Sequence, residues 1–126
     1  MAKQKLKPRR SAGVAAVELP GAARGIARKH PELWKAYQRL GEQASRAGPV
    51  DARSRRLVHL AFAIATGSEG ATHSHTRRAL AEGLTAEELE HVALLAITTI
   101  GWSNAVKGLT WVRDVTNPKS AREENP

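Results

Sequence analysis

Arg56, His59 and His75 are the side chains in this 126-residue sequence whose types and spacing best fit acid–base chemistry on a charged small molecule. Arg56 and His59 are three residues apart, which places them on one face of a helix. The arginine offers a permanent cation with fixed hydrogen-bond donors, and each imidazole titrates near neutral pH. A cation beside one or two such groups suits an anionic organic acid.

Two of these residues also have a purely structural interpretation. His59 lies within the apolar residues 57–65, where a histidine is more often a hydrogen-bonded part of the core than a catalyst. Arg56 belongs to a basic turn with Arg53 and Arg55, which fits a solvated face or a salt bridge between subunits. Both interpretations stay open beside the functional one.

Other reactive groups are few. The sequence has no cysteine, which excludes disulfides, thiolate nucleophiles and thiolate metal ligands. His73 and His75 are two residues apart and point to nearly opposite sides of a helix, so they cannot share one metal ion. A zinc site built from His59 and His75 would need a third ligand that the sequence does not identify, and Ser68 has no evident base. We therefore expect neither a metal nor a cofactor.

Helices must position these residues, and Pro31 and Asp51 mark the first two clear helix starts. Pro31 fits the first position of a helix over residues 31–46, and Asp51 can cap a second helix. The interior of this second helix, residues 57–65, is apolar on nearly all sides, which indicates burial. Gly67 can end it in the left-handed conformation.

A third helix is expected over about residues 68–82, and a capping box formed by Thr85 and Glu88 starts a fourth. The fourth helix carries apolar residues on two faces, which in so short a chain indicates a buried contact between subunits. Gly101 ends or kinks this helix, and a fifth helix is expected over about residues 103–114.

Composition favours one helical domain with a basic extension. The sequence is 41% hydrophobic but only 4% aromatic, which favours helices packed through small aliphatic side chains. The net charge is +8, yet residues 1–29 hold eight basic residues and one acid, against 12 basic and 11 acidic in the other 97. We expect a largely flexible basic arm over 1–29, a helical domain over 30–116 and a polar tail over 117–126.

The same features predict location and additional partners. No apolar stretch approaches the roughly 20 residues that cross a bilayer, and the basic amino terminus lacks the apolar region of a signal peptide. We therefore expect a cytoplasmic protein without membrane contact. The basic arm fits a solvated extension, and it is also compatible with a nucleic acid or another polyanion as an additional partner.

The segment from Asp51 to Val112 resembles the carboxymuconolactone decarboxylase and alkylhydroperoxidase D-like family. The resemblance rests on the order and spacing of DARSRRLVHLAFAIATG, SEGATHSHTRRALAEGLTAEELEHVALLA, a glycine turn at Gly101-Trp102 and a last helix. It implies an all-α bundle of about five to six helices that assembles as a homo-oligomer, either a trimer or a hexamer.

Peroxidase members of this family carry two cysteines and a histidine on the third helix and a glutamate about three turns upstream. In this chain His75 matches the histidine, whereas Ser68 and Ala71 stand at the cysteine positions and Arg56 at the glutamate position. The resemblance therefore implies a member that cannot run the thiol-based peroxidase reaction.

The remaining residues fit the decarboxylase branch of the family, which removes carbon dioxide from a lactone carboxylate. Packing as in the family would bring His75 to the face of Arg56 and His59. We expect Arg56 to bind the anion, His75 to handle the proton beside His59, and Trp102 and Ser68 to help bind substrate. These roles predict a thiol-independent lyase or isomerase that acts on a small organic acid.

An alternative of another class fits the same sequence. The protein is then a catalytically degenerate family member that serves as an oligomeric binding protein. In that case the basic residues 1–29 hold a polyanion.

Overall fold

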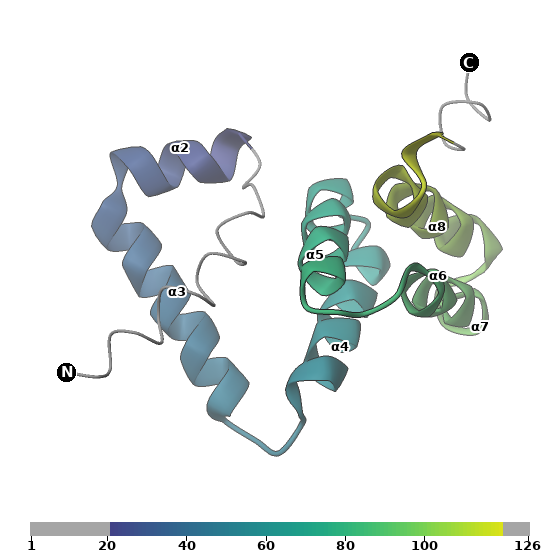
Figure 1. Cartoon of the computed structure of the whole chain (residues 1–126), viewed down its shortest axis with the longest axis horizontal. Helices are drawn as coiled ribbons and strands as arrows, with labels where there is room; N and C mark the ends of the chain where they lie inside the picture. The colour runs from purple at the N-terminus through teal and green to yellow at the C-terminus, as the bar shows by residue number, and fades with distance from the viewer. Residues whose placement is uncertain (1–20, 120–126) are drawn as a thin grey trace.

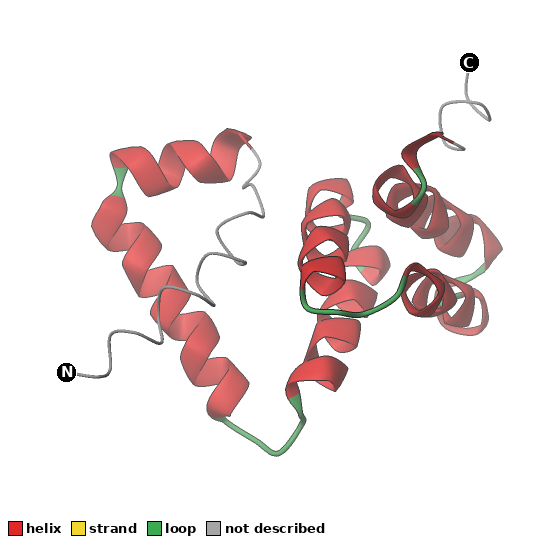
Figure 2. Cartoon of the chain, viewed as in Figure 1, coloured by secondary structure: helices red, strands yellow, loops and turns green. Residues whose placement is uncertain are grey.

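The computed structural model describes residues 21–119, and every regular element in this range is a helix (Figure 1, Figure 2). This confirms the predicted all-α class. Residues 1–20 and 120–126, which include most of the predicted arm and tail, lie outside the described residues. The helices are α2 (Gly21–Lys29), α3 (Pro31–Arg46), α4 (Ala52–Ala65), α5 (Glu69–Ala81), α6 (Ala86–Leu95), α7 (Ile97–Ile100) and α8 (Trp102–Thr116). None of these helices is long and apolar enough to cross a membrane.

Capping side chains set the helix starts that the sequence predicts. Asp51 Oδ1 accepts a hydrogen bond from the amide of Ser54 at 2.8 Å at the start of α4. At the start of α6, Thr85 and Glu88 each accept a hydrogen bond from the backbone amide of the other, as in a capping box. These bonds satisfy amides that have no partner within the helix, so both predicted starts are confirmed.

Glycines in the left-handed region end or separate the helices. Gly67, with a φ of 69°, follows α4, and Gly101, with a φ of 91°, separates α7 from α8. The expected fourth helix is divided before Gly101 is reached. The amide of Ala96 bonds to the carbonyl of Ala93, three residues back instead of four, and this tightened turn separates α6 from α7.

Helices α4, α5, α6 and α8 surround the hydrophobic core (Figure 1). Helix α5 packs against both α4 and α8. Its buried Thr72 and Thr76 donate their hydroxyls to backbone carbonyls one turn earlier, so they satisfy their polar atoms inside the core. The largest cluster of buried apolar residues is aliphatic: Leu60, Ile64, Ala79, Leu84, Leu89, Ala93 and Val112. This packing fixes α5, the helix that carries His75.

Helix α4 is less buried within this chain than its apolar sequence predicts. Leu60 and Ile64 are buried, but the side chain of Phe62 is 63% exposed and Val58 is also exposed. The reason is that α5, α6 and α8 cover only one face of α4. The uncovered face leaves apolar surface of the kind that often contacts another protein surface.

Helices α2 and α3 form a hairpin that stands beside the bundle (Figure 1). They pack against each other, and neither contains a buried residue. A connection over residues 47–51 joins α3 to α4, so the hairpin and the bundle form the two arms of a V. Side chains of the hairpin and of α5 line a shared pocket.

Gly108 allows α8 to approach α4 closely. A Cβ atom at this position would lie 2.5 Å from Cγ2 of Ile64, a β-branched side chain fixed in the core. We expect Gly108→Ala to lower the free energy of unfolding by about 1–2 kcal/mol, because overpacking outweighs the gain in helix propensity. Denaturant unfolding of the two proteins measures this change.

Gly41→Ala is the matched control for this substitution. Position 41 is also within a helix, but an added Cβ meets nothing within 4 Å, so alanine should raise stability by up to about 1 kcal/mol. The double variant Gly108→Ala with Ile64→Ala should lose less free energy of unfolding than the sum of the losses in the two single variants, because Ile64→Ala removes the obstructing methyl group. Stabilisation by Gly108→Ala would contradict the close approach.

Candidate functional site

The structure brings Arg56, His59 and His75 together where α4 meets α5. Arg56 Nη1 lies 2.8 Å from Nδ1 of His75. The rings of His59 and His75 have centroids 5.4 Å apart and are inclined by 45°. The helices therefore place the three residues on a common surface, as expected, while their roles in catalysis stay predictions.

Glu82, at the carboxyl end of α5, holds the guanidinium of Arg56 in place. Arg56 Nε donates to Glu82 Oε1 at 3.0 Å, and Arg56 Nη2 donates to Glu82 Oε2 at 2.9 Å. The Arg56 side chain is only 15% exposed, so this paired fork compensates for the lost hydration of the cation. Glu82 is a site residue that sequence reasoning missed, since nothing in its local sequence indicates a partner on α4.

The contact with Arg56 determines which nitrogen of His75 carries the proton. A guanidinium has only donors, so Nδ1 of His75 must accept and the proton of the neutral ring must be on Nε2. Burial, together with the charges of Arg56 and Arg78, lowers the pKa of His75 to about 4. Near neutral pH, His75 is therefore a neutral imidazole whose Nε2–H group is a donor and whose basic nitrogen is already engaged.

His59 experiences the same environment in weaker form. Burial lowers its pKa first, and the nearby charge of Arg56 lowers it further. Both imidazoles thus favour the neutral form, so the positive charge of this region comes from the arginines.

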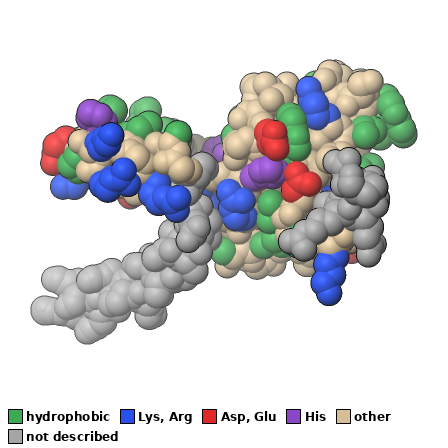
Figure 3. Space-filling view, turned by 90° about the horizontal axis from the view of Figure 1, so that it is seen from above, with side chains coloured by type: hydrophobic (Ala, Val, Ile, Leu, Met, Phe, Trp, Pro, Cys, Tyr) green, Lys and Arg blue, Asp and Glu red, His purple; other side chains and the backbone are tan. Residues whose placement is uncertain are grey.

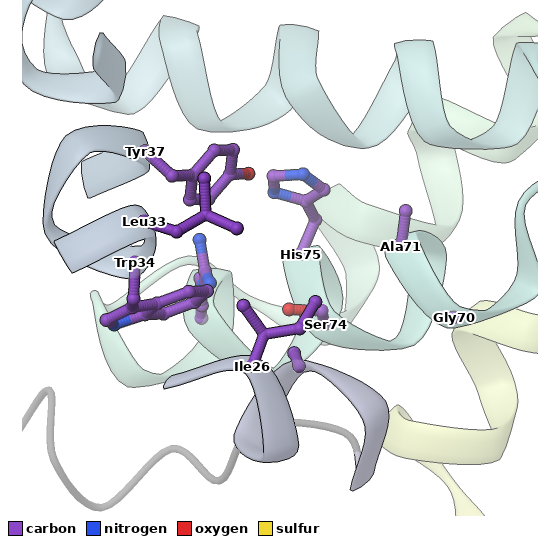
Figure 4. A pocket seen from close by; sticks show the side chains of 10 residues that line it. Ile26, Leu33, Trp34, Tyr37, Gly70, Ala71, Ser74 and His75 are labelled. Atoms are coloured by element: carbon purple, nitrogen blue, oxygen red, sulfur yellow. The ribbon is translucent and has the colours of Figure 1, made fainter. Parts of the chain in front are cut away.

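A pocket of about 480 Å³ lies between the α2–α3 hairpin and α5 (Figure 4). The hairpin contributes a mostly apolar and aromatic wall: Ala23, Ile26, Leu33, Trp34 and Tyr37. Helix α5 contributes the opposite wall: Gly70, Ala71, Ser74, His75 and Arg78. In Figure 4 the hydroxyl of Tyr37 points toward the ring of His75. His75 therefore connects the Arg56–Glu82 pair to a space that can hold a small molecule.

Several lining residues were missed by the sequence reasoning. Arg78 follows His75 by three residues on α5, so helical spacing from the matched histidine could have indicated it. Trp34 and Tyr37 lie on the helix expected over residues 31–46. Nothing in their local sequence indicates that they face α5 across a pocket.

Ser68 and Trp102 lie away from the lining of this pocket. The Ser68 hydroxyl accepts a hydrogen bond from the amide of Ala71 at 3.2 Å and so caps α5. Trp102 begins α8, and its side chain is 68% exposed in the single chain. A role of either residue in substrate binding stays a prediction.

His73 and His75 face different parts of the molecule, as their spacing predicts. His73 Nε2 lies 2.9 Å from Asp114 Oδ2 on α8, whereas His75 contacts Arg56 of α4. Glu69 lies beside this pair, and one ligand atom from each of Glu69, His73 and Asp114 falls within 4.8 Å of the others. A paired histidine next to two accessible carboxylates is common without a metal, so the group by itself does not define a metal site.

The fold and the site define an all-helical protein with a cysteine-free pocket beside a paired arginine and histidine. The family follows from the sequence match. Residues 31–114 match the sequence model of the carboxymuconolactone decarboxylase family, and the chain belongs to this family. The predicted family membership is confirmed.

Two further comparisons describe how far the similarity extends. The crystal structure of a candidate carboxymuconolactone decarboxylase from Burkholderia xenovorans has a TM-score of 0.62 and 20% identity, over 98% of both chains. At this identity the likeness shows the fold alone. An uncharacterized protein of Haemophilus influenzae is 35% identical over 54 residues, 43% of this chain. The chain matches 48%, about half, of the length of that relative.

Proposed function

We propose that this protein is a thiol-independent lyase or isomerase that acts on a small organic acid in the pocket beside His75. The observation that supports this proposal most directly is the 2.8 Å contact between Arg56 Nη1 and His75 Nδ1. Because Nδ1 accepts this hydrogen bond, the neutral ring of His75 offers an Nε2–H donor to the pocket that it lines. Such a donor suits reactions in which negative charge develops on a carbonyl oxygen. Membership of a family named for a decarboxylase supports a reaction of this class.

Arg78 is better placed than Arg56 to bind the carboxylate of a substrate. The sequence favours Arg56 for this role, but its guanidinium is already hydrogen-bonded to Glu82 and His75. Arg78 lines the pocket itself. We therefore assign anion binding to Arg78 and the positioning of His75 to Arg56.

A decarboxylation in this site follows a simple order of events. The bond to the departing carboxylate breaks, and its electron pair moves onto the adjacent carbonyl group to form an enolate. The Nε2–H group of His75 donates a hydrogen bond to the enolate oxygen, while Arg78 holds a carboxylate that the substrate retains. Carbon dioxide leaves, and the carbon takes a proton from water that enters the pocket.

Incubation of the full chain with muconolactone-type acids and other small unsaturated acids tests this proposal. We expect at least one acid to be consumed, with a change in ultraviolet absorbance and, for a decarboxylation, release of carbon dioxide. Measurements with inhibitors of thiols should give the same rate, because the chain has no cysteine. Binding of acids without any conversion would reject the enzyme and favour a binding protein.

The basic amino-terminal region favours the binding protein as a second candidate function. Helix α2 contains Arg24, Arg28 and Lys29 and no acidic residue, and Figure 3 shows Lys and Arg side chains on the α2–α3 side of the molecule. If this region holds a polyanion, deletion of residues 1–20 should lower the salt concentration that elutes the protein from heparin or DNA. This deletion retains α2 and its contribution to the pocket. Unchanged elution would reject polyanion binding by residues 1–20.

Exposed apolar side chains support assembly with further copies of this chain. Within the described residues, Phe62 of α4 and Leu95 of α6 are 63% and 59% exposed, and Leu94 is exposed beside Leu95. We expect a homo-oligomer, either a trimer or a hexamer, that covers such surface. Leu95→Arg should shift the mass measured by light scattering toward the monomer.

Thr110→Arg is the control for this assembly test, because it adds the same charge at an exposed polar position of α8. It should leave the mass unchanged. A wild-type protein that is monomeric at high concentration would reject assembly altogether, and an oligomeric Leu95→Arg variant would remove α6 from the interface.

A further inference from the structure

The pocket beside His75 combines one charged group with an aromatic wall. Trp34 and Tyr37 are three residues apart on α3, and their rings form a tilted pair with centroids 5.5 Å apart and an angle of 36°. Both rings line the pocket. Aromatic faces arranged in this way favour another ring, in offset or edge-to-face contact, over an aliphatic group of equal size.

Arg78 provides the charge of the pocket. Among residues 21–119, no carboxylate forms an ion pair with Arg78, whereas Arg53, Arg56 and Arg113 each pair with a glutamate. A partly buried guanidinium at a pocket is a strong donor pair for a carboxylate, because its fork matches the two oxygens. The histidines beside it favour their neutral forms and so do not provide a second cation.

The α5 side of the pocket leaves room for a flat molecule. Gly70, Ala71 and Ser74 have little or no side chain, and a Cβ atom added at Gly70 would meet nothing within 4 Å. The opposite wall carries the rings of Trp34 and Tyr37. The space between the two walls therefore suits a thin, planar group.

We propose that the pocket selects planar aromatic carboxylates, with the ring against Trp34 and Tyr37 and the carboxylate on Arg78. The inference rests on the proposed function only for the location of the site, since it concerns binding and not conversion. The Nε2–H group of His75 then faces a polar substituent of the bound ring or its carboxylate. A planar acid is held at both ends, whereas an aliphatic acid or a neutral ring is held at one.

Calorimetric titration of the full chain with three matched probes tests the selection. Benzoate should bind most tightly. Cyclohexanecarboxylate, which keeps the charge but not the planar ring, should bind about 3–10-fold more weakly, and benzamide, which keeps the ring but not the charge, about 10-fold or more weakly. Equal affinity for benzoate and cyclohexanecarboxylate, or no binding of benzoate, would overturn the inference.

Two pairs of variants locate the binding. Arg78→Gln should remove the preference for benzoate over benzamide, while Arg39→Gln, on the exposed surface of α3, should retain it. Gly70→Leu should fill the pocket and weaken benzoate binding by about 10-fold or more, without loss of thermal stability. Gly41→Leu, at an equally open helical glycine outside the pocket, should bind as the wild type does. Full benzoate affinity in Arg78→Gln or in Gly70→Leu would place the ligand elsewhere.

Failure of the selection for aromatic acids and failure of the proposed catalysis give different experimental results. Benzoate binding with the expected variant effects, but no conversion of any acid, supports the selection and rejects the lyase or isomerase. Conversion of aliphatic acids by a protein that does not bind benzoate supports the enzyme and overturns the selection.

Discussion

Replacing His75 by leucine should lower the turnover of the organic acid by about 10²–10³-fold. The substitution removes the hydrogen-bond donor that faces the charge developing on the enolate oxygen, and losses of this size are typical for one such donor. The value of kcat should fall more than the affinity for the acid, because Arg78 still binds the carboxylate. Steady-state kinetics on the acid identified by the incubation screen measures both.

Substitution of His75 by glutamine distinguishes a donor from a proton carrier. A glutamine amide can accept a hydrogen bond from Arg56 through its oxygen and donate one to the substrate through its nitrogen. If His75 acts as a neutral donor, His75→Gln should retain more activity than His75→Leu. Equal inactivity of the two variants would instead indicate that His75 transfers a proton, as the resemblance to the family first suggests.

The control for both variants is His91→Gln, which changes an exposed histidine of α6 that does not line the pocket. It should keep wild-type kinetics. Circular dichroism and light scattering should show that all three variants retain the helical fold and the wild-type mass. Full activity in His75→Leu would remove His75 from the mechanism.

The helices of this protein were predictable because their ends are encoded locally. Asp51 and Thr85 each bond to an amide three residues further along, and Gly67 adopts a positive φ that suits glycine. None of these features depends on a distant part of the chain. The interruption at Ala96 was not predicted, because neither glycine nor proline marks it in the sequence.

The site was predictable only in part, because its contacts cross between helices. The match of His75 to a family histidine, together with the spacing of Arg56 and His59, was enough to predict that these three residues lie close together. The partner Glu82 and the ring wall of α3 depend on how α5 packs against α4 and faces the hairpin, which helical periodicity does not determine. The role proposed for Arg56 changed from binding the anion to positioning His75 for the same reason. The spacing of residues along α4 indicates which side chains are neighbours on that helix, but it does not indicate that Glu82 at the carboxyl end of α5 pairs with Arg56.

The stability of the fold should fall between pH 6.5 and pH 4 because of His75. Its pKa is about 4 in the folded protein, below the ordinary value of 6.5 that applies to the unfolded chain. In this interval the unfolded state binds a proton that the folded state does not, so acid favours unfolding. The contribution of neutral His75 to the free energy of unfolding is fully present above pH 6.5 and is lost as the pH falls toward 4.

The difference between wild type and His75→Gln isolates this contribution. At pH 4.5 the wild type should have lost about 1–2 kcal/mol more of its pH 7 stability than the variant, after allowance for the partial exposure of the ring. Carboxylates such as Asp51 and Glu88, whose pKa values are lowered mainly by hydrogen bonds at the helix starts, are present in both proteins and cancel in the difference. Denaturant unfolding at pH 7 and pH 4.5 gives the four free energies required.

The sign of this difference also decides the protonation state on which the proposed chemistry depends. A ring held neutral by burial and by Arg56 makes the wild type the more acid-sensitive protein. If the ring of His75 were instead protonated and paired with Glu82, the folded state would hold the proton more tightly than the unfolded state. The wild type would then be more resistant to acid than His75→Gln. That result would contradict the neutral Nε2–H donor, and with it the assignment of Arg56 as the residue that positions His75.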